Sequence, residues 1–368
     1  MNIELPISKS IANRLLILQA IHGDELMPVS DSMPDDVQIL HNALTTLRTF
    51  KTSKTLSTPH IDVGNCGTAM RFLTAYCAQL DGQTTILDGI ERMRHRPIGQ
   101  LVEALREIGA QIEYLGEEGF PPLRINGCVL AKHRIVIINN PQSTQFVSAL
   151  LLIGANVQTD STSPYITLTR ALIEQYALAS SPYRLSPLAI ERDWSSAAFW
   201  YEYVALYGGE IELPGLYKDS LQGDKVVADI FSHLGVHTTY TAEGITLSPI
   251  AYSEASYSPL SGRPIAAQAA SRSKILVQDF GNCPDLYPAV ALTCERLGIK
   301  LHATGIESLP IKESDRLRAV AEHRTDADHR MAMALLIAGY EVDDTACISK
   351  SYPQFIEQFQ RINSIKVQ

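Results

Sequence analysis

Basic and acidic side chains are closely spaced in the stretch 309–316, which reads LPIKESDR. Pro310 is typical of the first turn of a helix, and a helix from there would carry Lys312 and Arg316 on one face. Glu313 lies between them. Two cations and a carboxylate at a helix N-terminus, where free N–H groups favour anions, suit a phosphorylated substrate that must exchange a proton. Taken alone, such a pattern is more often an exposed helix with solvated charges.

Further basic residues lie close to other predicted helix starts. Six helix openings share a small or polar capping residue followed by an apolar helix, and they lie at 9–11, 66–68, 143–145, 193–195, 282–285 and 326–329. The cations at or near predicted helix starts are Lys9, Arg14, Arg71, Arg96, Lys312, Arg316 and Arg330. If the apolar helices of each half pack in parallel, their N-termini emerge at one end and attract anions.

Length and composition limit the class of protein. A chain of 368 residues is larger than one hydrophobic core usually serves, so two domains are expected. The net charge of −9 argues against a nucleic-acid surface and against attachment to anionic membranes. Without a long apolar run or a signal peptide, a cytoplasmic protein is expected. The six cysteines lack metal-ligand spacing, which predicts buried free thiols and no metal site.

The helix openings also divide the chain into six weakly similar units of helix, turn and β-rich segment. Three units lie on each side of a Ser- and Pro-rich linker near 180–187. We therefore expect an N-terminal lobe over 9–185 and a C-terminal lobe over 186–368, joined by residues 1–8. Residues 251–273, rich in Ser, Ala and Pro, are predicted to form a long surface loop.

The residues at these helix starts resemble the motifs of one family, the EPSP synthases or 3-phosphoshikimate 1-carboxyvinyltransferases. The matching stretches read LPISKSIANR from residue 5, GNCGTAMR from 64, RMRHRPI from 92, STQF from 143, IKESDR from 311, DHRMAM from 328 and SKSYP from 349. They follow the order of the family's own motifs. The resemblance therefore covers nearly the whole chain and is highly specific.

The resemblance implies a fold, a reaction and partners. The fold is a two-lobed inside-out α/β barrel, each lobe having three β-α-β-α-β-β repeats with helices packed inside and mixed sheets outside. The reaction transfers the enolpyruvyl group of phosphoenolpyruvate to the 5-hydroxyl of shikimate 3-phosphate, and it releases phosphate through a tetrahedral intermediate. It belongs to the shikimate pathway of aromatic amino-acid biosynthesis. No metal, organic cofactor, nucleic acid or membrane is implied, and we expect a monomer.

Carried over residue by residue, the resemblance implies two overlapping sets of binding residues. Shikimate 3-phosphate would be held by Lys9, Ser10, Arg14, Ser143, Thr144, Gln145, Tyr165, Asp285, Ser308 and Lys312. Phosphoenolpyruvate would be held by Lys9, Asn65, Gly67, Arg96, Gln145, Arg316, Arg330 and Lys350. Arginines grip carboxylates and phosphates bidentately, whereas lysines act as compact charges. Ser308 stands where many members have Asn, which puts its substrate contact in doubt.

The attacking hydroxyl must lose a proton while the vinyl carbon gains one. We expect Asp285 to be the base for the hydroxyl, and Glu313 to protonate the methylene carbon and reclaim the proton. Lys9 is the alternative partner in that step, and Lys312 completes the expected catalytic set. A carboxylate among cations normally has a lowered pKa, so Glu313 needs desolvation or a substrate charge to act as an acid.

Three units are shorter than the resemblance implies. The second unit has a full hairpin, with strands over 111–115 and 123–125, but no room for a hairpin remains near 45–60, 177–185 or 323–325. Either these hairpins have been lost or the sequence lacks segments of the natural chain. Omission is favoured, because lost strands would leave unpaired edges and exposed apolar surface.

Two other functions remain open on the sequence. The sister enolpyruvyl transferase that acts on UDP-N-acetylglucosamine typically has Asn where Ser10 stands, and a reactive loop cysteine that is not evident here. A non-catalytic anion-binding scaffold would not need an intact Asp285 and Glu313. Gly67 leaves the open space that herbicide-sensitive members of the family have, so glyphosate binding is a further hypothesis.

Overall fold

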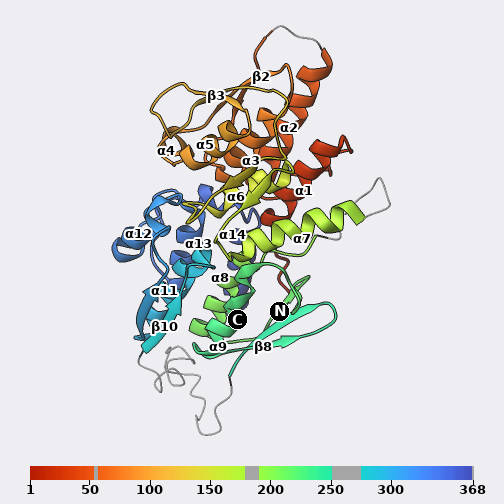
Figure 1. The fold of residues 1–368 in the computed structure, drawn as a ribbon. Helices are drawn as coiled ribbons and strands as arrows, with labels where there is room; N and C mark the ends of the chain where they lie inside the picture. Colours follow the sequence, from red (N-terminus) through yellow and green to blue (C-terminus); the bar gives the residue numbers. More distant parts are fainter. Residues whose placement is uncertain (54–56, 179–189, 251–274, 367–368) are drawn as a thin grey trace. The chain divides into compact units, whose positions relative to one another are not determined.

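The computed structural model describes residues 1–53, 57–178, 190–250 and 275–366. The chain divides into two compact units: unit 1 comprises Met1–Ser8 and Glu191–Gln368, and unit 2 comprises Lys9–Ile190. In Figure 1, unit 2 runs from red to yellow-green, and both chain ends lie in unit 1. The predicted boundary between 185 and 186 and the loop predicted over 251–273 lie outside the described residues.

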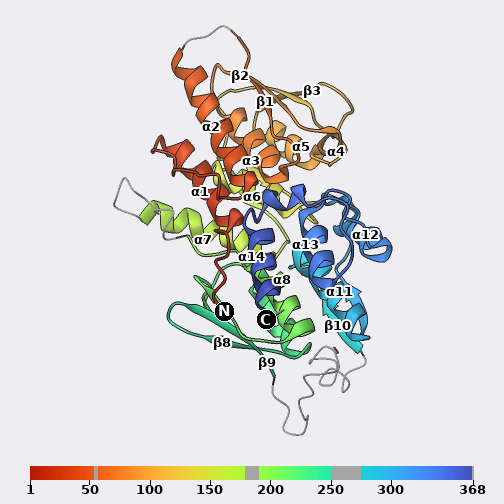
Figure 2. The same cartoon turned by 180° about the vertical axis from the view of Figure 1, so that it is seen from behind.

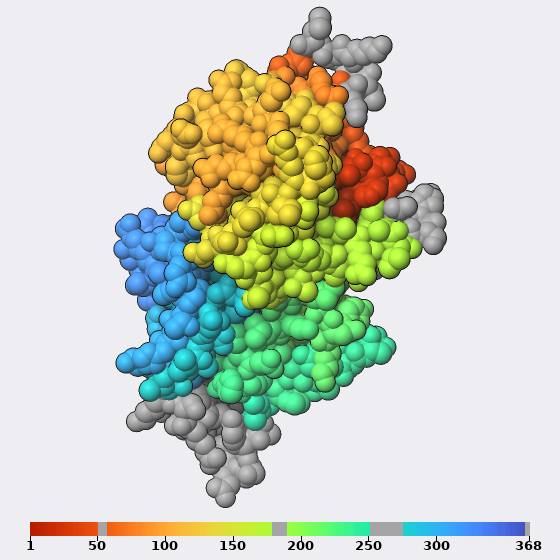
Figure 3. Space-filling model, in the orientation of Figure 1, coloured from red at the N-terminus to blue at the C-terminus, as the bar shows by residue number. Residues whose placement is uncertain are grey.

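Unit 2 contains apolar helices that pack against one another. Its helices are α1 (Lys9–His22), α2 (Asp35–Ser53), α3 (Gly67–Ala78), α4 (Glu91–Arg94), α5 (Gly99–Glu107), α6 (Thr144–Leu152) and α7 (Pro164–Leu178). Helices α1, α3 and α6 contact one another, and α7 packs against both α1 and α6. The space-filling view shows α1, in red, beside α7, in yellow-green (Figure 3). The first helices of the three predicted units therefore share one core.

The strands of unit 2 form two separate sheets. They are β1 (His60–Asp62), β2 (Thr84–Asp88), β3 (Gln111–Tyr114), β4 (Leu123–Asn126), β5 (Ile135–Ile137) and β6 (Asn156–Gln158). One sheet has the order β1-β2-β4-β3, in which β1 and β2 are parallel and the other pairs are antiparallel. The hairpin predicted after the second helix of that unit is confirmed as β3 and β4. The other sheet is the parallel pair β5-β6.

Unit 1 also combines packed helices with two small sheets. Its helical elements are α8 (Trp194–Tyr207), η2 (Gly223–Val226), α9 (Val227–Ser232), η4 (Pro284–Leu286), α11 (Tyr287–Leu297), η5 (Leu309–Ile311), α12 (Arg316–Glu322), α13 (His329–Ala338), η6 (Ala346–Lys350) and α14 (Phe355–Lys366). Its strands are β7 (Ile211–Pro214), β8 (Val236–Tyr240), β9 (Gly244–Pro249), β10 (Ile275–Asp279) and β11 (Lys300–Thr304). The sheets are an antiparallel β7-β9-β8 and a parallel β10-β11.

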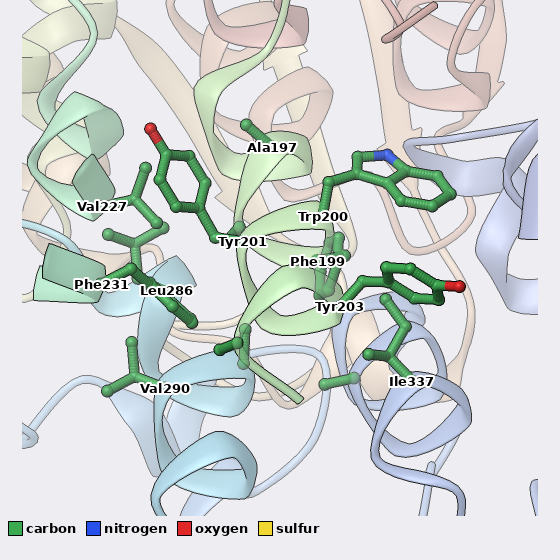
Figure 4. Close-up of a cluster of buried hydrophobic side chains, with 14 of the residues drawn as sticks. Ala197, Phe199, Trp200, Tyr201, Tyr203, Val227, Phe231, Leu286, Val290 and Ile337 are labelled. Carbon is green, nitrogen blue, oxygen red and sulfur yellow. The ribbon is translucent and has the colours of Figure 1, made fainter. Parts of the chain in front are cut away.

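Helix α8 lies at the centre of the core of unit 1. Its side chains are buried on all sides from Trp194 to Leu206, which is the pattern of a helix surrounded by other elements. Figure 4 shows Phe231 from α9, Val290 from α11 and Ile337 from α13 around it. Helices α8, α11 and α13 contact one another, as their counterparts do in unit 2.

The N-terminal segment belongs to this unit because it is tied to α14 and β7. The carbonyl of Glu4 accepts a hydrogen bond of 2.9 Å from Gln358, and the carbonyl of Asn2 accepts one of 3.2 Å from Arg361. The segment runs beside α14 in the view from behind (Figure 2). None of the helices in the described ranges is long and apolar enough to cross a membrane.

The parallel strand pairs carry exposed apolar side chains. The exposed fractions are 54% for Ile135 and 59% for Ile137 in β5, and 51% for Ile275 and 71% for Val277 in β10. Within the described residues no strand lies between α12 and α13, or at 57–59 after α2. The hairpin expected after α7 would fall outside the described residues. The short sheets thus expose the apolar surface that missing strands were expected to leave.

Candidate active site

In unit 2 the predicted site residues gather at helix N-termini. Cys66 and Ser143 cap α3 and α6 through their side chains, as expected, so the backbone N–H groups of these first turns are partly satisfied. The residues placed at or just before these ends are Lys9 and Ser10 in α1, Asn65 and Gly67 at α3, Ser143, Thr144 and Gln145 at α6, and Tyr165 in α7. Arg14 lies in the second turn of α1. Gln145 donates a hydrogen bond of 2.9 Å to Thr68, which joins two of these ends.

Arg14 is a buried cation held by neutral oxygen atoms. Its Nε donates to Thr169 at 2.7 Å, and its Nη1 donates to the carbonyl of Ser10 at 2.7 Å. Its Nη2 donates to Ser148 at 3.2 Å and to the carbonyl of Tyr165 at 3.3 Å. Burial lowers the pKa of Arg14 to about 10. A buried guanidinium with only neutral partners is costly, and an anionic ligand would offset that cost.

Lys9 has a carboxylate partner that the sequence analysis missed. Its Nζ lies 2.9 Å from Oδ2 of Asp36, whose side chain is 5% exposed. The carbonyl of Asp36 also accepts a contact of 3.7 Å from the thiol of Cys66. The available signal was the pair Asp35 and Asp36 in the first turn of α2, where acids favour the helix dipole.

Gly67 is close to two arginines. Nη1 of Arg71 donates to the carbonyl of Gly67 at 3.1 Å, and Nη2 donates to the carbonyl of Pro97 at 3.3 Å. A Cβ atom added at Gly67 would lie 2.5 Å from Nη1 of Arg71 and 2.7 Å from Nη1 of Arg96. The prediction of open space beside Gly67 is therefore wrong for this structure, because the guanidinium groups of Arg71 and Arg96 fill that space. Arg71 was predicted as one of the cations near helix starts, but it was not assigned to a substrate.

In unit 1 the predicted helix from Pro310 is wrong. Leu309–Ile311 is a single 3₁₀ turn, Lys312 has an extended backbone, and α12 begins only at Arg316, after its N-cap Asp315. Lys312 and Arg316 therefore do not share a helix face. The N-cap carboxylate of Asp315, which binds the N–H of Arg318, overrides the start signal of the earlier proline.

Arg316 is instead the centre of an ionic cluster. Its Nε lies 2.8 Å from Asp328, its Nη1 2.8 Å from Asp285, and its Nη2 3.1 Å from Glu313. Its side chain is fully buried. Burial alone would lower the pKa of Arg316, but the three carboxylates, Asp328 most of all, raise it overall. We call the whole set the Arg316 cluster, and its members are Asp285, Lys312, Glu313, Arg316, Asp328, Arg330 and Lys350.

Asp285 bridges three cations of the Arg316 cluster. Its Oδ1 lies 2.8 Å from Arg316 and 3.6 Å from Lys312, and its Oδ2 lies 2.8 Å from Arg330. Burial would raise the pKa of Asp285, but Arg330, Lys312 and Arg316 hold it well below its usual range. Asp285 lies in η4 and does not cap α11. The carboxylate is thus ionised and fixed in orientation.

Glu313 pairs with Arg316, as expected, and the second cation that it contacts is Lys350. Its Oε2 accepts a hydrogen bond of 3.1 Å from Arg316, and its Oε1 accepts one of 3.0 Å from Lys350. Asp328, which the sequence analysis did not include among the site residues, both caps α13 and pairs with Arg316. Ser308 is half-buried and precedes the first residue of η5.

The two sets of residues differ in what they can do. In the Arg316 cluster, each guanidinium nitrogen of Arg316 already binds a carboxylate. Nη1 of Arg330 is buried and has no partner among the described residues, so it is available to an anion. The described residues contain no group of three or more His, Cys, Asp or Glu placed to bind a metal. None of the six cysteines forms a disulfide, and Cys128 and Cys347 are only half-buried.

Comparison with known proteins gives a consistent result. The family model described as EPSP synthase (3-phosphoshikimate 1-carboxyvinyltransferase) matches residues 1–325 and 320–359. The 3-phosphoshikimate 1-carboxyvinyltransferase of Bacteroides fragilis is 35% identical over 417 aligned positions, which cover 98% of this chain and 94% of the relative. That of Cellvibrio japonicus is 31% identical over 434 positions, covering 98% and 96%.

These alignments are longer than the chain of 368 residues, so the relatives carry residues without a counterpart here. That agrees with the shortfall inferred from the repeat units. A solved structure of EPSP synthase from Acinetobacter baumannii has a TM-score of 0.64 and 18% sequence identity, and the match covers 98% of this chain and 95% of that one. At this identity the likeness shows a shared fold.

Proposed function

The chain belongs to the EPSP synthase family, and we propose that its two units divide the work of the family's reaction between them. The activity is that of a 3-phosphoshikimate 1-carboxyvinyltransferase of the shikimate pathway. In this proposal the residues of unit 2 bind the phosphorylated acceptor. The carboxylates of the Arg316 cluster, in unit 1, handle the protons.

Arg14 is the observation that carries the proposal for unit 2. It is a buried cation with neutral partners, next to the α6 and α7 ends that carry Ser143 and Tyr165. A phosphate dianion would supply the missing negative charge and would also accept hydrogen bonds from the helix N-termini. We therefore assign shikimate 3-phosphate to Lys9, Ser10, Arg14, Ser143, Thr144, Gln145 and Tyr165, with Asp285, Ser308 and Lys312 contributing from unit 1.

Phosphoenolpyruvate is assigned to residues from both units, most of them cations. In unit 2 the candidates are Lys9, Asn65, Gly67, Arg96 and Gln145, and in unit 1 they are Arg316, Arg330 and Lys350. The partnerless Nη1 of Arg330 supports its assignment. Arg316 can reach the substrate only if Asp285 or Glu313 gives up its present hydrogen bond.

The proton steps are assigned to the two carboxylates that share Arg316. Asp285 accepts the proton of the 5-hydroxyl as its oxygen attacks C2 of phosphoenolpyruvate, and C3 gains a proton from Glu313. The tetrahedral intermediate then loses a proton from C3 to Glu313 as the C–O bond to phosphate breaks, and the departing phosphate takes up the proton that Asp285 had accepted from the hydroxyl. Lys9 is the alternative donor to C3, and Lys312 shields the charge on Asp285. A low pKa makes Asp285 a weak base, so the substrate must displace some of its cations.

The finer architecture is proposed in the same way. An inside-out barrel with three repeats in each unit is supported by the mutual packing of α1, α3 and α6, and of α8, α11 and α13. Lobes over 9–185 and 186–368, a monomer and a cytoplasmic location stay predictions from the family resemblance.

Phosphate release is the direct test of function. The protein is incubated with phosphoenolpyruvate and shikimate 3-phosphate, with phosphoenolpyruvate alone, and with UDP-N-acetylglucosamine as a different acceptor. We expect phosphate only with shikimate 3-phosphate. Turnover only with the nucleotide sugar would assign the chain to the sister reaction, and no turnover with either acceptor would support a scaffold.

A further inference from the structure

Asp36 is a buried acid that has no assigned part in the reaction. It lies in the first turn of α2. Its Oδ2 lies 2.9 Å from Nζ of Lys9, whose side chain is largely buried as well. Its Oδ1 is also buried and has no hydrogen-bond partner among the described residues. The cation that this carboxylate contacts is therefore a residue assigned to both substrates.

Two ordinary reasons for an acid at this position do not account for its burial. An acid in the first turn of a helix favours the helix dipole, but Asp35 in the same turn already supplies such a charge. A buried ion pair stabilises a fold little, because the cost of removing both charges from water offsets most of their attraction. The burial of Asp36 is better explained by its effect on Lys9.

The backbone of Asp36 is held beside the start of another helix. Its carbonyl oxygen accepts a contact of 3.7 Å from the thiol of Cys66, which is the N-cap of α3. Such a contact is weak by itself, but α2 also packs against both α1 and α3. Asp36 thus joins the starts of α1, α2 and α3, and it fixes Lys9 relative to the end of α3 that carries Gly67.

The contact with Asp36 restricts a flexible cation. A lysine loses much side-chain entropy when its ammonium is fixed, so a ligand that must fix the ammonium binds more weakly than one that finds it in place. An ammonium has three donors, so the contact with Asp36 does not exhaust the capacity of Lys9 for anions. The carboxylate also repels an anion, and the two effects have opposite signs that an experiment can separate.

We propose that Asp36 is a positioning residue that acts through Lys9, and that it strengthens the binding of both substrates by fixing the ammonium in advance. The fixing outweighs the repulsion because the positive charge of Arg14, which has only neutral partners, is left to attract the anions. The inference rests on the proposed function, because the two anions are the substrates of that reaction.

The test is a double-mutant cycle on the binding of shikimate 3-phosphate, measured by calorimetric titration of the full chain. Asp36→Ala removes the contact and is expected to raise Kd about tenfold. Lys9→Met raises Kd by itself, and in that background Asp36→Ala is expected to cause no further rise, because no ammonium remains to be positioned. Asp31→Asn, at an exposed acid before α2, is the control and should bind as wild type does.

Asp36→Asn keeps the volume and an acceptor oxygen, so it replaces Asp36→Ala in the cycle if that variant does not fold, with an expected rise in Kd of about threefold. In steady state, KM for both substrates should rise while kcat changes by no more than about threefold. A Kd that is unchanged or lower without the carboxylate, or a rise that persists in the Lys9→Met background, would overturn the inference. Turnover of shikimate 3-phosphate by wild type tests the proposed function separately, so the two failures are distinguishable.

Discussion

Arg14 in unit 2 and Arg316 in unit 1 are both buried at the candidate site, and the two arginines have opposite surroundings. Arg14 in unit 2 has hydroxyl and carbonyl oxygens as partners and, among the described residues, no carboxylate within ion-pair distance. Arg316 in unit 1 has three carboxylates, one for each guanidinium nitrogen. The pKa of Arg14 is lowered by burial, whereas the pKa of Arg316 is raised by its neighbours despite burial.

The difference separates binding from proton chemistry. A buried cation with only neutral partners lacks a compensating negative charge, and a bound phosphate supplies that charge. The charge of a cation surrounded by carboxylates is already compensated, so the cation attracts a further anion only weakly. It does fix the position and the ionisation of those carboxylates. Changes at Arg14 should therefore act mainly on affinity for the phosphorylated acceptor, and changes at Arg316 and its carboxylates mainly on turnover and folding.

The largest effect is expected for Glu313→Gln. An amide cannot exchange the proton with C3, so kcat should fall by about 10²- to 10⁴-fold while KM for shikimate 3-phosphate changes by no more than about twofold. Steady-state phosphate release measures both constants. Glu322→Gln, at an exposed ion pair with Arg318, is the matched control and should keep wild-type rates. Equal losses of kcat in Glu313→Gln and Glu322→Gln would contradict the assignment of proton chemistry to Glu313.

Replacing Arg316 or Arg14 by Met should change the free energy of unfolding by different amounts. Arg316→Met leaves three carboxylates around an apolar side chain and should lower the free energy of unfolding of unit 1 by about 3–5 kcal/mol. Arg14→Met should cost no more than about 1 kcal/mol, because Thr169 still donates to Ser148 and the positive charge had no carboxylate.

Tryptophan fluorescence is suited to the measurement of Arg316→Met. The chain has two tryptophans, Trp194 and Trp200, and both are buried in α8 of unit 1. Urea unfolding followed at this signal reports on unit 1, and circular dichroism reports on the whole chain. A stability of Arg316→Met equal to that of wild type would show that the carboxylates do not depend on the cation.

Acid should unfold unit 1 before unit 2. Asp285 has a folded-state pKa below its unfolded value of about 3.9, so the stability it contributes is present above that pH and is lost as the pH falls through the folded pKa. Tryptophan fluorescence should then change at a higher pH than circular dichroism. Asp285→Asn should flatten the dependence of the fluorescence midpoint on pH below about 4. If the fluorescence and circular dichroism transitions of wild type occurred at the same pH, the two units would not differ in acid stability.

Gly67→Ala should have the smallest effect, and it should act on affinity. The added Cβ pushes against the ends of two flexible side chains, Arg71 and Arg96, which can shift at a cost of about 1 kcal/mol. KM for phosphoenolpyruvate should rise roughly fivefold with little change in kcat. The glyphosate hypothesis is tested in the same series, because inhibition that competes with phosphoenolpyruvate is expected for wild type. No inhibition at high glyphosate would reject it.

Much of the fold was predictable because its signals are local. The caps Cys66, Ser143, Asp193 and Asp328 each precede an apolar helix, and the structure begins helices at these points. The hairpin of β3 and β4 follows from alternating apolar residues around a Gly-rich turn. The shortened units were also visible in the spacing between helices.

The site could be predicted from the sequence only where family motifs identify its residues. The helix expected from Pro310 failed because the N-cap at Asp315 starts α12 later, and no local pattern in the stretch 309–316 decides between the two. The pairing of Lys9 with Asp36, and of Arg316 with Asp328, joins segments that are distant or differently folded. Such partners depend on tertiary packing, which a single sequence does not reveal.

Calorimetric titration with shikimate 3-phosphate tests most directly whether acceptor binding depends on Arg14 and not on Glu313. Wild type and Glu313→Gln should bind it with similar Kd values, because Glu313 is not among the residues assigned to the acceptor. Arg14→Met should bind about 10- to 100-fold more weakly, since charge-assisted hydrogen bonds are worth about 1.5–3 kcal/mol. Wild-type affinity in Arg14→Met together with lost binding in Glu313→Gln would contradict the account.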